Sequence, residues 1–173
     1  MNKTITTNII RFILIIAVQV VVFSQITFTI GDVAYIHFII YPLAILLMPV
    51  KTPRAVLLLS AFVVGIVIDM FFSSPGIHAA ALVFTAYIRN TIIALIEPYE
   101  GYNTADIPSL QNFGLGWFVS YLSISLLIHI FVYFSIEAFS FVYFFEIFLN
   151  TIFSFIVSFI VILLSQFIFR TKY

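Results

Sequence analysis

The run Gly65-Ile-Val-Ile-Asp-Met-Phe-Phe-Ser-Ser-Pro-Gly-Ile-His78 joins two long apolar segments and places one carboxylate inside the first of them. Proline presets a turn, glycine allows a positive φ, and serine can cap the helix that begins near Ile77. Moving an ionised side chain into hydrocarbon costs about 2.5 to 3.5 kcal/mol, so we expect Asp69 to face protein or water. The run therefore predicts a tight helical hairpin within a membrane.

The composition agrees with a membrane location. Of the 173 residues, 64% are hydrophobic and only 8% are charged, and the mean hydropathy is +1.24. A chain with so little polar surface cannot form a water-soluble globule, and we expect no nucleic-acid partner. The absence of cysteine excludes disulfides and thiolate chemistry. The longest polar stretch, Glu97 to Asn112, is too short to form a soluble domain.

Six apolar segments are long enough to cross a bilayer as helices, which requires about 20 residues each. We therefore predict an all-α integral membrane protein that forms a single six-helix domain over residues 1–173, with residues 97–113 as its only long connection. A β-barrel is disfavoured because its strands would alternate in polarity. The predicted spans are approximately 9–28, 33–50, 55–72, 77–96, 115–136 and 141–169.

The basic residues give the expected orientation. With six spans, every lysine and arginine falls on one face of the membrane, which the positive-inside rule makes cytoplasmic. We therefore expect both termini and the 97–113 loop on the cytoplasmic side of a multi-pass protein. The basic residues are Lys3, Arg11, Lys51, Arg54, Arg89, Arg170 and Lys172.

Polar and small residues recur at four-residue spacing on several predicted helices, which places them on single faces. In the third span Ala61, Gly65 and Asp69 form such a face, and small residues there favour close helix packing. In the sixth span the same spacing relates Glu146, Asn150, Ser154 and Ser158. These stripes should face protein, where ordinary interhelical hydrogen bonds would account for most of them.

The topology brings several ionisable residues to the outer end of the bundle, where a polar cluster of His37, His129, Glu146 and Asn150 is expected near Asp69 and His78. A metal site and proton-coupled transport are alternatives, although no His-xxx-His spacing occurs. The chain has neither a Gly-x-Ser-x-Gly elbow nor a His-Glu-x-x-His helix. We therefore predict no catalytic residues, no bound metal and no cofactor.

The hairpin motif resembles that of the rod shape-determining protein MreD family. The matching residues are Gly65, three apolar residues, Asp69, and then Ser73-Ser74-Pro75-Gly76-Ile77-His78-Ala79. The length, the six-span hydropathy, a proline in the second span (Pro42) and the basic turn Lys51-Thr52-Pro53-Arg54 extend the likeness over nearly the whole chain.

This resemblance implies a non-enzymatic scaffold subunit of the bacterial elongation complex in the cytoplasmic membrane. The expected partners are the transmembrane helix of MreC, then MreB, RodA and a class B penicillin-binding transpeptidase, together with membrane lipids. The residues assigned to partner binding or to the structural motif are Ala61, Gly65, Asp69, Pro75, Gly76 and His78, and Glu97, Glu100 and Asp106 are candidates for cytoplasmic contacts.

The MreD family is also similar in fold to the substrate-binding components of energy-coupling-factor vitamin transporters. These are six-helix proteins with an outward-opening pocket. The alternative function is therefore that of such a component. It predicts a bound small molecule, whereas the scaffold predicts a stable membrane partner.

Overall fold

The computed structural model describes residues 13–22, 27–30, 34–103 and 106–168, which are mostly helical. Residues 13–21 form a helix, and the elements that follow are β1 (Thr27–Ile30), β2 (Ala34–His37), α2 (Pro42–Leu46), α3 (Arg54–Phe72), α4 (Ile77–Leu95), α5 (Leu110–Ala138), the 3-10 turn η2 (Phe141–Tyr143) and α6 (Phe144–Ile168). Among the described residues four helices, α3 to α6, are long and apolar enough to cross a membrane. The chain is an integral membrane protein.

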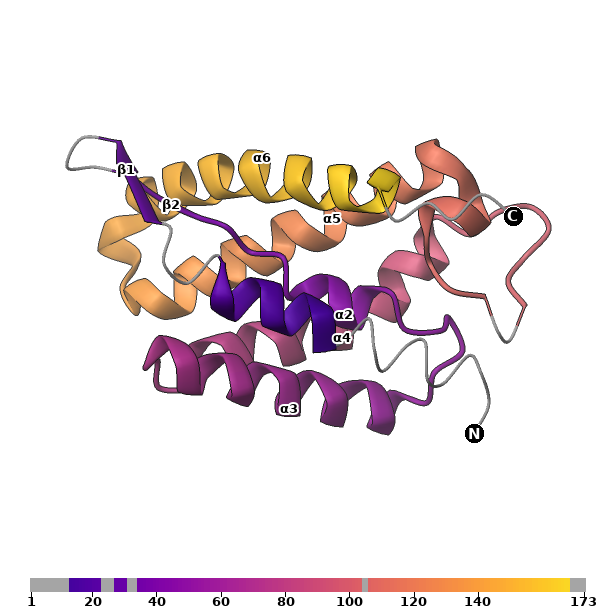
Figure 1. The fold of residues 1–173 in the computed structure, drawn as a ribbon, viewed down its shortest axis with the longest axis horizontal. Helices are drawn as coiled ribbons and strands as arrows, with labels where there is room; N and C mark the ends of the chain where they lie inside the picture. The colour runs from indigo at the N-terminus through magenta and orange to yellow at the C-terminus, as the bar shows by residue number, and fades with distance from the viewer. Residues whose placement is uncertain (1–12, 23–26, 31–33, 104–105, 169–173) are drawn as a thin grey trace.

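The four long helices lie side by side, and each packs against the next along the chain. Strands β1 and β2 pair antiparallel, with Thr27 opposite His37. This hairpin lies at the end of the bundle that carries the α3–α4 turn, which we call the turn end, and residues 97–103 and 106–109 lie at the opposite loop end (Figure 1). Fully buried apolar side chains of α4 and α5, such as Leu82, Leu122 and Leu126, fill the centre.

The prediction of a continuous helix over 33–50 is wrong. Strand β2 is followed by an extended stretch that leads into the five-residue helix α2. This segment, residues 34–50, runs along the long helices from the turn end to the loop end, and we call it the broken passage or second passage (Figure 1). The predicted first span, 9–28, is helical over 13–21, but its last two residues belong to β1. Residues 9–12 and 23–26 of that span lie outside the described residues. The mostly helical membrane fold is therefore confirmed, whereas the described residues before α3 do not form the two further transmembrane helices that were expected.

Side chains from two neighbouring helices hold the extended stretch. The Ser154 hydroxyl of α6 accepts the His37 N–H at 3.0 Å, and the Ser158 hydroxyl accepts the Ile39 N–H at 2.8 Å. From the other side, the amide of Gln19 donates to the Phe38 carbonyl and accepts the Ile40 N–H, both at 2.8 Å. Non-helical backbone at membrane depth is tolerated only where protein or water satisfies its polar groups, and here three side chains do so.

Proline at position 42 explains where the helix resumes. Inside a longer helix its ring would clash with the carbonyl four residues earlier and remove a hydrogen bond, whereas at the first turn of α2 neither penalty arises. All five residues of α2 are buried, so this short helix packs in the core of the bundle.

The last four predicted spans lie on α3 to α6. Helix α5 begins earlier than expected, at Leu110, but it contains a break at Gly114 (φ 78°, ψ 171°), so its regular part starts at the predicted residue, Leu115. The Ser109 hydroxyl accepts the Asn112 N–H and caps the short leading turn. Residues 110–113 therefore belong to α5 and not to the predicted loop.

Candidate functional site

Asp69, near the end of α3, caps the start of α4. Its Oδ1 accepts the His78 N–H and its Oδ2 accepts the Ala79 N–H, each at 3.0 Å. The first N–H groups of a helix have no partner within the helix, and the positive end of the helix dipole favours a negative charge there. One carboxylate thus joins the two helices, and its side chain is only 5% exposed.

Ser74 and His78 complete the binding of this carboxylate. The Ser74 hydroxyl lies 2.5 Å from Asp69 Oδ1 and 2.9 Å from His78 Nδ1, and Nδ1 lies 3.0 Å from the same Oδ1. Because an ionised carboxylate only accepts, Ser74 donates its single proton to Asp69, and Nδ1 of His78 must carry the proton that points to this pair. The serine therefore faces the same ring nitrogen as the aspartate, unlike in a Ser-His-Asp triad, where the two occupy opposite nitrogens.

The remaining motif residues shape the turn. Ser73 ends α3 in the left-handed conformation (φ 53°), Pro75 lies within the turn, and Gly76 (φ 86°) precedes α4. A Cβ at Gly65 would overlap the Cα of Ala79 and lie 2.8 Å from its nitrogen, so the two helices touch backbone to backbone there. Ala61 is fully buried. This small-residue face is used within the chain itself.

A second polar group lies deeper in the bundle, around His129 of α5. The Thr85 hydroxyl donates to the Ala81 carbonyl and lies 2.8 Å from His129 Nδ1, while His129 Nε2 lies 2.8 Å from the Tyr41 hydroxyl. Since the threonine proton is already used, Nδ1 donates to Thr85 and Nε2 accepts from Tyr41. This pattern fits a neutral imidazole that ties α4, α5 and the broken passage together.

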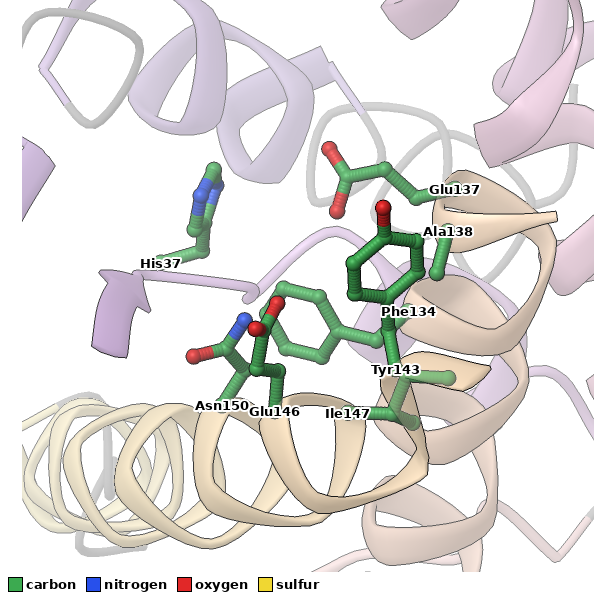
Figure 2. Close-up of a pocket in the computed structure, with 8 residues that line it drawn as sticks. All are labelled: His37, Phe134, Glu137, Ala138, Tyr143, Glu146, Ile147 and Asn150. Carbon is green, nitrogen blue, oxygen red and sulfur yellow. The ribbon is translucent and has the colours of Figure 1, made fainter. Parts of the chain in front are cut away.

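A cavity of about 360 Å³ opens at the turn end (Figure 2). It brings together three residues of the predicted outer cluster, His37, Glu146 and Asn150. His129 does not line it. The other lining residues, which no sequence pattern indicated, are Phe134, Glu137, Ala138, Tyr143 and Ile147.

Aromatic contacts connect this cavity with the Asp69 group. The ring of Tyr133 lies 4.9 Å from that of His78 and 6.2 Å from that of His37, measured between centroids. The Tyr133 hydroxyl donates to Glu137 Oε1 at 3.3 Å. Tyr133 thus separates the capped turn from the cavity and contacts both. Among the described residues, no group of three or more histidines or carboxylates is placed to bind a metal ion.

Arg89 of α4 binds the other end of the broken passage. It is fully buried, and its Nη2 donates to the carbonyls of Met48 and, at 3.4 Å, Pro49. Its Nε donates to the Tyr121 hydroxyl at 3.1 Å, and that hydroxyl donates to the Leu46 carbonyl at 3.0 Å. Tyr121 and Arg89 thus satisfy the Leu46 and Met48 carbonyls, whereas the Pro49 carbonyl also accepts the Thr52 N–H at 3.1 Å.

The candidate cytoplasmic residues lie at the loop end. Glu97 and Glu100 are exposed, and Asp106 accepts the Asn103 N–H at 2.7 Å. Tyr102 folds back and donates to the Ile93 carbonyl at 2.9 Å, and burial raises the pKa of its hydroxyl. The loop is thus anchored to α4, while its glutamates face away from the protein.

Over the described residues, these features define a helical membrane protein with an aspartate-capped hairpin, an extended segment whose backbone is held by side-chain hydrogen bonds, and a cavity at the turn end that is lined by polar and aromatic side chains. The chain matches no protein-family model, no curated protein and no solved structure.

Proposed function

We propose that this chain is a non-enzymatic scaffold subunit of the bacterial cell-elongation complex. In this role it binds the transmembrane helix of MreC and helps couple MreB filaments to peptidoglycan synthesis by RodA and a class B transpeptidase. The observation that carries the proposal is the capping of α4 by Asp69. The residues that resemble the MreD motif are the residues that fix the α3–α4 hairpin, which is what a binding scaffold requires.

The docking surface is the outer face of this hairpin. Ala61 and Gly65 are occupied within the bundle, whereas Phe62, Val63 and Met70 of α3 expose 52%, 59% and 77% of their surface. In a membrane these side chains meet lipid or a partner helix. Asp69 then acts as a positioning residue, because it sets the angle at which α3 presents this face.

The proposed topology has six passages. The helix at 13–21 belongs to the first and the β2–α2 segment forms the second, so the loop end faces the cytoplasm together with both termini. Lys51 and Arg54 lie next to α2 and at the start of α3, at the loop end. Their position supports this orientation through the positive-inside rule.

A second candidate function is that of a substrate-binding component of an energy-coupling-factor vitamin transporter. The cavity of about 360 Å³ at the turn end favours it, because small-molecule sites measure about 300 to 1,000 Å³. A bound vitamin and an ATP-driven transport module are expected in this case, and a stable MreC contact is not.

The two functions are separated by mass spectrometry of the proteins that co-purify with a tagged chain from native membranes in mild detergent. Recovery of MreC and RodA is expected, whereas recovery of an ATP-driven module would favour the transporter. The Asp69→Ala variant should recover at least fivefold less MreC at equal expression. Ser158→Ala, which loosens the fold away from the hairpin, controls for instability. Equal recovery with Asp69→Ala would remove the hairpin from the mechanism.

A further inference from the structure

We propose that the cavity at the turn end binds a ligand that presents a primary ammonium group on an apolar or aromatic body. The ammonium lies between the carboxylates of Glu137 and Glu146, which belong to different helices. This proposal does not depend on the scaffold role, since it concerns a cavity on the far side of Tyr133 from the Asp69 cap.

The charges around the cavity favour a cation. No lysine or arginine occurs between Arg89 and Arg170 in the sequence, and within the described part of the chain neither glutamate forms an ion pair. Glu137 lies in the last turn of α5, where the negative end of the helix dipole disfavours a carboxylate and favours a cation. A bound ammonium group would offset both charges.

The side chains converge on one space from three elements. The Glu137 carboxylate extends across the cavity on the side of His37, and Glu146 and Asn150 rise from α6 beneath it (Figure 2). The Tyr133 hydroxyl donates to Glu137 and holds it in this position. The rings of Phe134 and Tyr143 form apolar walls, and aromatic faces attract organic cations.

Hydrogen bonds to its backbone place His37 in the wall of the cavity. Ser154 accepts its N–H and Ser158 donates to its carbonyl, at 3.0 and 3.3 Å. Its ring also lies against Phe134, with centroids 5.6 Å apart. An unbroken helix over 33–50 would not bring this backbone to the serines of α6. The break in the second passage is therefore what completes the cavity.

Two sources can supply the ammonium group, namely a soluble amine or the ethanolamine headgroup of a lipid. For the first, the full chain in phosphatidylglycerol nanodiscs is titrated with tyramine, and with 3-(4-hydroxyphenyl)propanoate, which carries a carboxylate in place of the amine. For the second, native mass spectrometry counts the phosphatidylethanolamine retained from a mixture with phosphatidylglycerol. We expect saturable binding of tyramine but not of the carboxylate, or selective retention of phosphatidylethanolamine.

The variant Glu137→Gln/Glu146→Gln should weaken tyramine binding or lipid retention at least tenfold, and Glu137→Asp/Glu146→Asp should restore part of it. Glu97→Gln/Glu100→Gln removes the same charge at the loop end and controls for attraction of cations to the protein as a whole. Size-exclusion profiles identify any variant that fails to fold, and the single substitution Glu146→Gln then replaces the double one. Absence of both signals, or equal binding by the Gln variants, would overturn the proposal.

Discussion

Replacing Gly65 by alanine should destabilise the fold, whereas the same replacement at Gly116 should stabilise it. Both glycines lie within helices, and alanine favours a helix over glycine by about 1 kcal/mol. At Gly116 a new Cβ meets no atom within 4 Å, so a gain of about 0.5 kcal/mol or more is expected. At Gly65 it overlaps the Ala79 backbone, and because backbone cannot rotate away, overpacking costs about 1 to 3 kcal/mol.

Because the new Cβ would overlap the Ala79 Cα itself, the overpacking cost falls in the upper part of this range, at about 2 to 3 kcal/mol. After the helix-propensity gain of about 1 kcal/mol is subtracted, Gly65→Ala should lose about 1 to 2 kcal/mol, which corresponds to roughly a five- to thirtyfold change in the unfolding equilibrium. Unfolding in mixed detergent micelles with increasing dodecyl sulfate measures the difference. The chain has one tryptophan, Trp117, whose fluorescence reports the transition, and circular dichroism provides a second signal. If Gly65→Ala is as stable as the parent chain, α3 and α4 do not touch at this position and the account of the hairpin is wrong.

Three further substitutions test other contacts by the same unfolding measurement. Asp69→Ala removes a buried acceptor of four hydrogen bonds and should cost about 3 to 5 kcal/mol, whereas Asp106→Ala at the exposed loop should stay within about 0.5 kcal/mol. Equal losses of stability in Asp69→Ala and Asp106→Ala would show that Asp69 does not cap α4. Ser158→Ala leaves a buried backbone N–H unpaired and should cost about 1 to 3 kcal/mol and speed amide exchange at residues 38–41. Ser165→Ala, whose hydroxyl bonds only within α6, should do neither. Arg89→Met removes the side-chain donor to the Met48 carbonyl, while Pro49 keeps its hydrogen bonds from Thr52, and the change should cost about 2 to 4 kcal/mol. A neutral result would show that water replaces the guanidinium.

The sequence predicts the last two-thirds of the fold well because its signals are local. Long apolar runs bounded by Ser73-Ser74-Pro75-Gly76 and by the polar loop define α3 to α6. The four-residue spacing of Ala61, Gly65 and Asp69 indicates one inward face, and all three residues are buried there. Each of these inferences needs only a helix and its neighbours in the chain.

The first third of the chain could not be predicted in this way, because its conformation depends on distant side chains. The run 33–50 is apolar enough for a helix, and only the serines of α6, more than a hundred residues away, reveal what holds it extended. Pro42 was the available signal of a break in this segment, because proline is disfavoured in the middle of a helix. The polar residue Gln19 in the first span was a second one. Glu137 was missed because its place in the cavity depends on the fold around it.

The break in the second passage costs backbone hydrogen bonds, and the residues that this segment positions indicate what the break provides. A continuous helix would satisfy its own backbone, whereas the observed segment needs Gln19, Ser154 and Ser158 along its length and Arg89 at its end. Four buried polar side chains thus replace hydrogen bonds that a helix would have made without them. The segment they hold carries His37 into the wall of the cavity and Tyr41 to His129. Ser154 and Ser158 of the α6 stripe therefore serve the interior of the bundle. In the proposed scaffold role, the surface offered to a partner is the apolar outer face of the α3–α4 hairpin, whose position Asp69 fixes.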